Sequence, residues 1–325
     1  MIAKSRIPQC QERQAVRQIN QKKLLRLCLD VQGYLFLPHH LVIIVSSRPR
    51  LEAKRQMINS SNVLEFPLTS AITPELALSV RGLSREFGDF LAVDNLNLDV
   101  YRGAFFGFLG PNGAGKSTTI KMLTGLLAPT QGSIEILNQD VTRDSTAIKR
   151  MIGVVPEDLN LFDRLTGAEY LTFVGRMHQL DSRVIAERTA ELLHVMELEH
   201  KPKSLIIEYS HGMRKKISLA AALLHNPQVL FLDEPFEGVD AVAARTIKNI
   251  LERMCERGVT IFLTSHILEI VERLCTDIAI INHGRLIAAG KLDEMREQAG
   301  TSLEDYFVSL VGNERQMAGT LSWIG

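Results

Sequence analysis

The sequence predicts an α/β fold interrupted by a helical insert, and three observations support this prediction. Short apolar or alternating segments, typical of strands, recur between residues 76 and 281. Between residues 165 and 224 the pattern becomes almost wholly helical. The chain of 325 residues contains 46% hydrophobic and 23% charged residues, ordinary values for a globular protein with a substantial core.

The predicted elements follow one another from residue 76. Residues 77–83 and 91–100 alternate apolar and polar residues as half-buried strands do, and residues 105–109 form an apolar strand ending at a glycine. A helix is expected over 115–127, and a small strand with two helices after residue 285. Further strands are expected at 133–137, 152–155, 229–232, 260–263 and 278–281.

Residues 1–75 differ in character from the rest of the chain. They show no sustained hydrophobic period, and residues 1–55 hold 11 Lys/Arg against three acids. We expect this extension to be poorly ordered or non-native, with the natural start at Met57. The alternative is a basic arm that lies on an anionic membrane surface. The apolar run 35–45 is too short to span a bilayer, which takes about 18 residues.

Charge and cysteine content exclude some classes of function. Lys plus Arg and Asp plus Glu each number 37, so the chain carries no formal net charge and we expect no nucleic-acid partner. The four cysteines stand far apart, without the paired spacing of a metal site. They indicate reduced thiols in a cytoplasmic protein.

Residues 110–117 match the pattern G-x-x-x-x-G-K-[ST] between an apolar strand and a helix. The glycines let successive backbone N–H groups point at one anion, and the helix adds its positive end. Lys116 is expected to reach the β- and γ-phosphates, and the Ser117 hydroxyl to ligate Mg²⁺. The motif therefore predicts binding of Mg-ATP, with a structural glycine-rich turn as the alternative. The expected nucleotide-binding residues are Gly110, Pro111, Asn112, Gly113, Ala114, Gly115, Lys116, Ser117 and Thr118.

Two acids, Asp233 and Glu234, follow the apolar strand 229–232. In open α/β sheets, ligands bind at the carboxyl ends of the strands, where Asp233 is expected to hold Mg²⁺ through water. Adjacent strand residues point to opposite sides, so Glu234 is better placed to polarise the attacking water as the catalytic base. The alternative is a strand end with two solvated acids.

His266 follows another apolar strand, residues 259–264. Three strands thus end in polar residues, at Ser117, Glu234 and His266, and these ends meet if the sheet is parallel. We therefore expect His266 in the same site, although a histidine at a strand end often serves only as a cap.

Together these motifs have the order and approximate spacing of the nucleotide-binding domains of ABC transporters. The residues that carry the resemblance are Phe87, the loop 110–117, the segment Tyr209-Ser-His-Gly-Met213, Asp233, Glu234, Asp240 and His266. The resemblance covers about residues 76–300. The ending 301–307 looks like that of ATPase subunits of ABC exporters whose permease is a separate chain.

The resemblance implies a P-loop NTPase core with a mixed or parallel sheet, an antiparallel β subdomain and a helical insert at about 157–225. Residues 301–325 would form a C-terminal helical tail. It also implies a cytoplasmic ATPase that uses ATP and Mg²⁺ and dimerises with a second ATP-binding subunit. An integral membrane permease, facing residues 161–170, would hold it at the inner face of the membrane.

The resemblance further implies a role for each matching residue. Phe87 would stack on the adenine. Ser210 and Gly212 would contact the γ-phosphate of an ATP held by the opposite subunit. Asp240 would link the two sites across the dimer, and His266 would hold the γ-phosphate and the attacking water in register.

Two positions depart from the family's pattern. Glu157 stands where the family usually has a Gln that faces the Mg²⁺ region and senses the permease. A carboxylate can still ligate a metal, so we expect retained function with altered coupling; the alternative is a loop acid with no metal role. The signature reads YSHGM in place of LSGGQ, so His211 replaces a glycine and this position does not require a positive φ.

Two other functions remain open at this point. A nucleotide-binding regulatory subunit with little turnover is favoured by Glu157 and the YSHGM signature. A non-transport ABC ATPase acting on DNA or ribosomes usually has two cassettes or a long coiled-coil insertion, and this chain has neither. A homodimer and a heterodimer are both compatible with the sequence.

Overall fold

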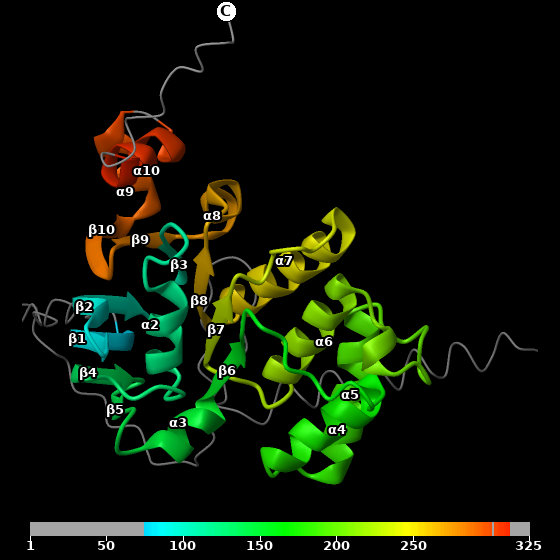
Figure 1. The fold of residues 1–325 in the computed structure, drawn as a ribbon. Coiled ribbons are helices and arrows are strands. Elements are labelled where there is room, and N and C mark those ends of the chain that lie inside the picture. The colour runs from blue at the N-terminus through cyan, green and yellow to red at the C-terminus, as the bar shows by residue number, and fades with distance from the viewer. Residues whose placement is uncertain (1–74, 301, 313–325) are drawn as a thin grey trace, which may run out of the picture. The chain divides into compact units, whose positions relative to one another are not determined.

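The computed structural model describes residues 75–300 and 302–312, which form two sheets with helices packed around them (Figure 1). Most of the N-terminal extension and residues 313–325 lie outside this range, so the expectations for them stay predictions, as do the domain boundaries. Among the residues described, no helix is long and apolar enough to cross a membrane.

The first sheet is antiparallel and four-stranded in the described part of the chain, with the order β2-β1-β4-β5. Its long hairpin shows the alternating burial that the sequence pattern predicts. This sheet confirms the expected antiparallel β subdomain. Its strands are β1 (Leu76–Phe87), β2 (Phe90–Tyr101), β4 (Gln131–Ile136) and β5 (Gln139–Asp140).

The second sheet has six strands within the described range, in the order β10-β9-β3-β8-β7-β6. All neighbouring pairs are parallel except β9 and β10, so the sheet is mixed, as expected. The carboxyl ends of β3, β7 and β8 therefore share one edge. The strands are β3 (Phe105–Leu109), β6 (Ile152–Val155), β7 (Val229–Asp233), β8 (Thr260–Ser265), β9 (Asp277–Asn282) and β10 (Arg285–Lys291).

Helices separate the strands, and those between β6 and β7 form the predicted helical insert. The insert contains α4 (Gly167–Met177), α5 (Ser182–Val195), the short 3₁₀ helix η1 (Ile206–Glu208) and α6 (His211–Leu223). The other helices are α2 (Lys116–Leu123), α3 (Ser145–Met151), α7 (Ala241–Glu256), α8 (Leu268–Leu274), α9 (Leu292–Ala299) and α10 (Leu303–Val311).

Helix α2 is shorter than the 115–127 that the sequence predicts. It ends at Leu123, and Gly125 adopts φ 68° just beyond it. A glycine with positive φ commonly ends a helix, because it turns the chain so that the N–H groups after the helix bond to the last carbonyl oxygens within it. The predicted C-terminal end of this helix was wrong, because the sequence stays apolar to Leu127 although Gly125 ends the helix earlier.

Helices lie on both sides of the six-stranded sheet (Figure 1). Buried apolar side chains form one layer on each of its faces. Strand β3 shows how, because Phe105 and Leu109 pack into one layer while Phe106 and Phe108 pack into the other. The first layer contains the buried faces of α6, α7 and α8, and the second contains α2 and the antiparallel sheet. The strand ends that carry the functional residues are thus fixed by a two-sided core.

Replacing Phe262 by alanine is expected to lower the free energy of unfolding by about 3–5 kcal/mol, because it opens a cavity inside the second layer. Its buried ring lies 5.4 Å from the rings of Phe106 and Phe108 and 5.6 Å from that of Phe231. Urea unfolding followed by circular dichroism measures the change, with Val308→Ala on the exposed face of α10 as the control. A loss no larger than that of the control would contradict this view of the core.

Candidate functional site

The loop between β3 and α2 leaves room only for glycine at two positions. Gly115, the N-cap of α2, adopts φ 106°, and a Cβ there would lie 2.6 Å from the carbonyl oxygen of Ala92. A Cβ on Gly110 would lie 2.3 Å from the carbonyl oxygen of Ile281. Within α2, all of which is described, no side chain caps the N-terminus and the first turn holds no acid. The first N–H groups of this helix are therefore available to an anion such as a phosphate.

Lys116 is held at the mouth of this loop. Its buried ammonium donates a hydrogen bond to the carbonyl oxygen of Gly110, with an N–O distance of 2.8 Å. The same nitrogen lies 3.5 Å from Glu234 Oε1, which makes a buried ion pair. The positive charge is thus fixed between the phosphate-binding loop and the end of β7.

Three oxygen-bearing side chains from separate elements meet beside the loop. Ser117 Oγ lies 3.1 Å from Glu157 Oε2 and 3.4 Å from Asp233 Oδ1. Burial raises the pKa of Asp233, while hydrogen bonds from Thr264 and Ser117 oppose that rise. Hydroxyl and carboxylate oxygens are the donors that Mg²⁺ prefers, so this set of residues fits a magnesium ion.

Glu234 follows β7 with a backbone φ of 47°, and its carboxyl group is buried. Its Oε2 lies 3.1 Å from His266 Nδ1. Its Oε1 makes no hydrogen bond to any described residue, although the Lys116 ammonium is nearby. The two acids at this strand end therefore face different partners: Asp233 faces Ser117, and Glu234 faces Lys116 and His266.

A pocket of ≈ 330 Å³ lies at the carboxyl ends of β3, β7 and β8. It is lined by nine of the predicted site residues, namely Asn112, Gly113, Gly115, Lys116, Ser117, Thr118, Glu157, Glu234 and His266. Pro111 and Ala114 line an adjoining hollow that Asn112, Gly113 and His266 share. The phosphate-binding loop, Glu157, Glu234 and His266 thus meet at one cavity, whereas Asp233 lines a neighbouring groove.

Phe87 is not among the residues that line this pocket. It lies half exposed at the end of the β1–β2 hairpin, with the Arg85 guanidinium 4.6 Å from its ring centroid. Its register partner Phe90 does line the pocket, together with Ala92 and Glu237. The sequence gives no signal for these three residues, and the adenine-stacking role of Phe87 stays a prediction.

Ser210, Gly212 and Asp240 form a second cluster, and none of them is among the residues that line the pocket. Ser210 caps α6 by accepting a hydrogen bond from the backbone N–H of Met213, at 3.3 Å. Asp240 caps α7, and the hydrogen bond from the backbone N–H of Ala243 lowers its pKa. A Cβ on Gly212 would lie 3.1 Å from Ala243 Cβ and 3.2 Å from Asp240 Oδ2, so glycine permits the close approach of α6 and α7.

His211 is the first residue of α6 and is not among the residues with a positive φ in the described part of the chain. This confirms the prediction that the position of His211, a glycine in the LSGGQ signature, does not require a positive φ. Its Nε2 lies 3.2 Å from the carbonyl oxygen of Glu237, which lines the pocket. The signature segment is thus joined to the loop that follows Glu234.

Two buried residues that the motifs do not include contact the acids directly. Thr264 Oγ1 donates a hydrogen bond to Asp233 Oδ1 at 2.6 Å. Lys215 Nζ donates to the carbonyl oxygen of Glu234 at 3.1 Å. Burial lowers the pKa of Lys215, and the surrounding carboxylates, that of Glu237 foremost, oppose this.

The fold, the glycine-rich loop and the paired acids define a P-loop ATPase, and comparison with known proteins gives the family. Residues 93–237 match the family described as ABC transporter, and residues 206–272 also match an AAA domain family. The chain is 37% identical over 226 residues to a daunorubicin resistance ATP-binding protein of Streptomyces coeruleorubidus, covering 70% of this chain and 72% of that protein. It is 39% identical over 218 residues to Nod factor export ATP-binding protein I of Cupriavidus metallidurans, covering 67% of this chain and 72% of that protein.

Solved structures agree with this assignment. An ATP-binding subunit of an ABC transporter superposes with a TM-score of 0.68 at 32% identity, covering 72% of this chain and 99% of that one. A dimeric ATP-binding cassette in a post-hydrolysis state with ADP and Pi has a TM-score of 0.62 at 25% identity, covering 66% and 98%. The chain belongs to the family of ABC transporter ATP-binding proteins. It is an ATPase subunit that binds and hydrolyses ATP.

Proposed function

We propose that this ATPase subunit powers a membrane exporter whose permease is a separate polypeptide, by closing a dimer around ATP and reopening it after hydrolysis. The observation that supports this best is the convergence of Lys116, Glu234 and His266 on one pocket, with the signature residues grouped apart from it. Two relatives, one named for the export of Nod factor and one for drug resistance, support export as the direction of transport. The subunit would work in the cytoplasm, on the inner face of the membrane.

Hydrolysis proceeds by attack of a water molecule in line with the γ-phosphorus. Glu234 Oε1, which has no hydrogen-bond partner among the described residues, accepts the proton of that water. His266 holds the other carboxylate oxygen and the γ-phosphate in register. Lys116 and the N–H groups at the start of α2 stabilise the negative charge that develops on the phosphate.

Ser117 and Asp233, together with Glu157, would hold the Mg²⁺ that accompanies ATP. The ion neutralises charge on the β- and γ-phosphates when it is bound. Glu157 extends from the loop after β6, and its carboxylate oxygen already lies against Ser117. We therefore retain the proposal that Glu157 replaces the usual glutamine in ligation and that coupling to the permease is altered.

The second cluster supports dimerisation. Ser210 and Gly212 would contact the γ-phosphate of an ATP held by a second ATP-binding subunit, and Asp240 would link the two sites. Ser210 and Asp240 are the exposed N-caps of α6 and α7, and the buried Gly212 lies in the first turn of α6; none of the three lines the pocket of its own chain. A dimeric cassette among the solved neighbours gives a precedent for this arrangement.

An exposed aromatic surface on the helical insert suits the permease. Phe162, Phe173 and Met177 are 53%, 41% and 68% exposed, and the rings of Phe162 and Phe173 meet edge to face with centroids 5.0 Å apart. Large exposed apolar side chains gathered in one place mark interaction sites. This surface overlaps residues 161–170, the segment expected to face the permease.

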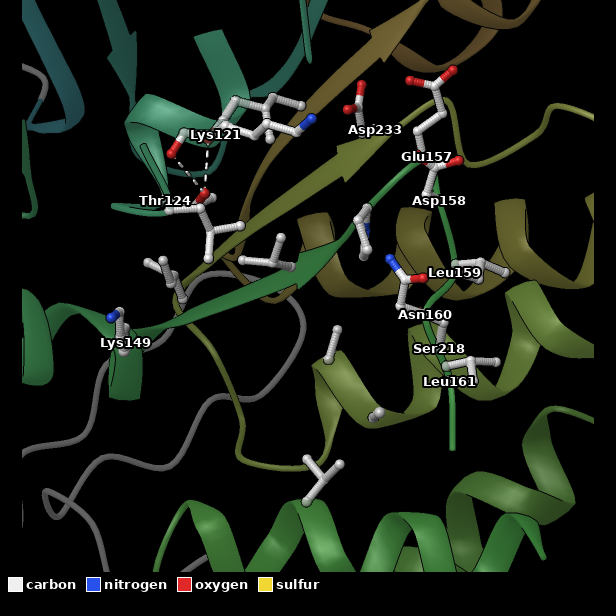
Figure 2. Close-up of a pocket in the computed structure, with 18 of the residues that line it drawn as sticks. Lys121, Thr124, Lys149, Glu157, Asp158, Leu159, Asn160, Leu161, Ser218 and Asp233 are labelled. Atoms are coloured by element: carbon white, nitrogen blue, oxygen red, sulfur yellow. Dashed lines mark hydrogen bonds between the residues drawn. The ribbon is translucent and has the colours of Figure 1, made fainter. Parts of the chain in front are cut away.

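A groove of ≈ 600 Å³ adjoins this surface, and residues Glu157, Leu159 and Leu161 line it (Figure 2). Figure 2 shows Asp158, Leu159, Asn160 and Leu161 following one another along the chain below Glu157 and Asp233. A permease segment seated in this groove would therefore touch the same loop that carries Glu157. A movement of the permease would then be transmitted through this loop to the nucleotide site.

Affinity capture from membranes tests the permease proposal. The Phe162→Ser/Phe173→Ser double variant is expected to lose a co-purifying multi-span membrane protein, identified by mass spectrometry, that the parent chain retains. The ATPase activity of the isolated subunit should stay near that of the parent, because neither ring lines the nucleotide pocket. Val308→Ser, at an equally exposed position on α10, is the control and should retain the partner. Capture of no multi-span protein by the parent chain would refute the transporter role.

A further inference from the structure

The backbone of Glu234 adopts a conformation that few residues other than glycine take. Its φ of 47° lies in the left-handed region, at the point where β7 ends. Such a conformation persists only where the surrounding structure holds it. It turns the chain so that the carboxyl group comes within reach of Lys116 and His266.

Thr264 holds the N–H side of this residue. It lies on β8 beside Asp233, is fully buried, and its Oγ1 accepts a hydrogen bond from the Glu234 N–H at 3.0 Å. The same hydroxyl donates to Asp233 Oδ1 at 2.6 Å. A single side chain therefore fixes the main chain of one acid and the carboxylate of the other.

Lys215 holds the carbonyl side. Its side chain is 2% exposed, and its Nζ donates to the carbonyl oxygen of Glu234 at 3.1 Å and to that of Glu157 at 3.4 Å. Lys215 lies on α6, in the second turn after the N-cap Ser210. Lys215 therefore ties the loops that carry Glu234 and Glu157 to α6, the helix that begins with the signature segment.

The two basic neighbours of Lys215 make a different kind of contact. Arg214 pairs with the carboxylate of Asp163 at 2.8 Å, and Lys216 pairs with that of Glu197 at 2.9 Å. The hydrogen bonds of Lys215 go instead to main-chain carbonyls next to the active site. Neither Lys215 nor Thr264 lines the nucleotide pocket, so both act through Glu234 and its loop.

We propose that Thr264 and Lys215 are positioning residues that clamp the two peptide groups of Glu234 and so aim its carboxylate at the attacking water. This inference rests on the proposed role of Glu234 as catalytic base. Because neither Thr264 nor Lys215 itself lines the nucleotide pocket, loss of the clamp is expected to lower kcat and to leave the KM for Mg-ATP nearly unchanged.

The first test compares Thr264→Val with Thr264→Ser. Valine has nearly the same shape but no hydroxyl, and a carboxylate misplaced by about 1 Å is expected to lower kcat roughly 10- to 100-fold. Serine keeps the hydroxyl and should restore kcat to within about threefold, with KM unchanged in both variants. Equal kcat values for the valine variant and the parent would overturn the proposal.

The second test compares Lys215→Met with Lys216→Met, because both lysines are buried on the same helix. The Lys215 variant should lose kcat roughly 10-fold or more, while the Lys216 variant stays within about twofold of the parent. Thermal unfolding of both variants and binding of a fluorescent ATP analogue show whether the fold and the nucleotide site are kept. Equal losses of kcat in the two variants would contradict the clamp and indicate a general packing effect.

The Glu234→Gln background separates this inference from the proposed function. If Thr264 acts through Glu234, adding Thr264→Val to Glu234→Gln lowers the residual turnover no further. A Glu234→Gln variant with full turnover would remove the catalytic role of Glu234 and the clamp with it. A Glu234→Gln variant with little turnover beside an unimpaired Thr264→Val would overturn the clamp alone.

Discussion

Glu234→Gln is expected to lower ATP turnover roughly 100-fold to 10,000-fold and to leave a stable ATP-bound dimer. Glutamine has the same shape, so the contact with His266 and the strand end should persist, but an amide does not accept the proton of the attacking water. The carboxylate oxygen concerned, Oε1, has no hydrogen-bond partner among the described residues and is buried. Because hydrolysis would reopen the dimer, blocking it should hold the two subunits together.

Phosphate release and gel filtration in Mg-ATP measure the two effects on one sample. The variant should elute as a dimer with Mg-ATP and as a monomer without nucleotide, whereas the parent should dimerise only transiently. Glu252→Gln, which removes a partly exposed acid paired with Lys248 at 3.6 Å, is the control and should behave as the parent. A Glu234→Gln protein that turns over normally and stays monomeric would remove Glu234 from the catalytic role.

Most strands could be predicted from the sequence, because the order of apolar and polar residues along a strand matches which of its side chains are buried. The run Phe105–Leu109 is apolar throughout because both of its faces pack in the core. The two-residue strand β5 and the seven-residue helix α3 cannot be predicted individually, since neither is long enough to display a period. Their place depends on pairing with β4 and on packing against β6.

The candidate site could be predicted as far as its residues belong to contiguous motifs. Gly115, Lys116 and Ser117 are recognisable because one contiguous loop supplies several phosphate contacts at fixed spacing. Thr264 and Lys215 could not be found in this way. Their function depends on which main-chain atoms lie opposite them after folding. A threonine within an apolar strand and a lysine in a basic run are common in proteins, and neither pattern by itself indicates a contact with a catalytic residue.

Lys116→Ala is expected to lower ATP turnover about 100-fold to 1000-fold and to weaken ATP binding as well. The ammonium is buried, is anchored 2.8 Å from the carbonyl oxygen of Gly110, and lies within the phosphate-binding loop. Its removal takes away the cation placed to neutralise the phosphates and leaves the buried carboxylate of Glu234 without its ion-pair partner. Both the ground state and the transition state should therefore lose stabilisation, so KM rises while kcat falls.

Titration with a fluorescent ATP analogue and phosphate release measure binding and turnover separately, and Lys248→Ala on α7, outside the nucleotide pocket, is the control. Parent-like binding by Lys116→Ala would show that the Lys116 ammonium does not contribute to nucleotide binding. The double variant Lys116→Ala/Glu234→Gln tests whether nucleotide binding must precede the association of two subunits. Because nucleotide must bind before it can join two subunits, this protein should stay monomeric in Mg-ATP although Glu234→Gln alone dimerises. A double variant that still forms the dimer would mean that subunit association does not depend on ATP at this loop.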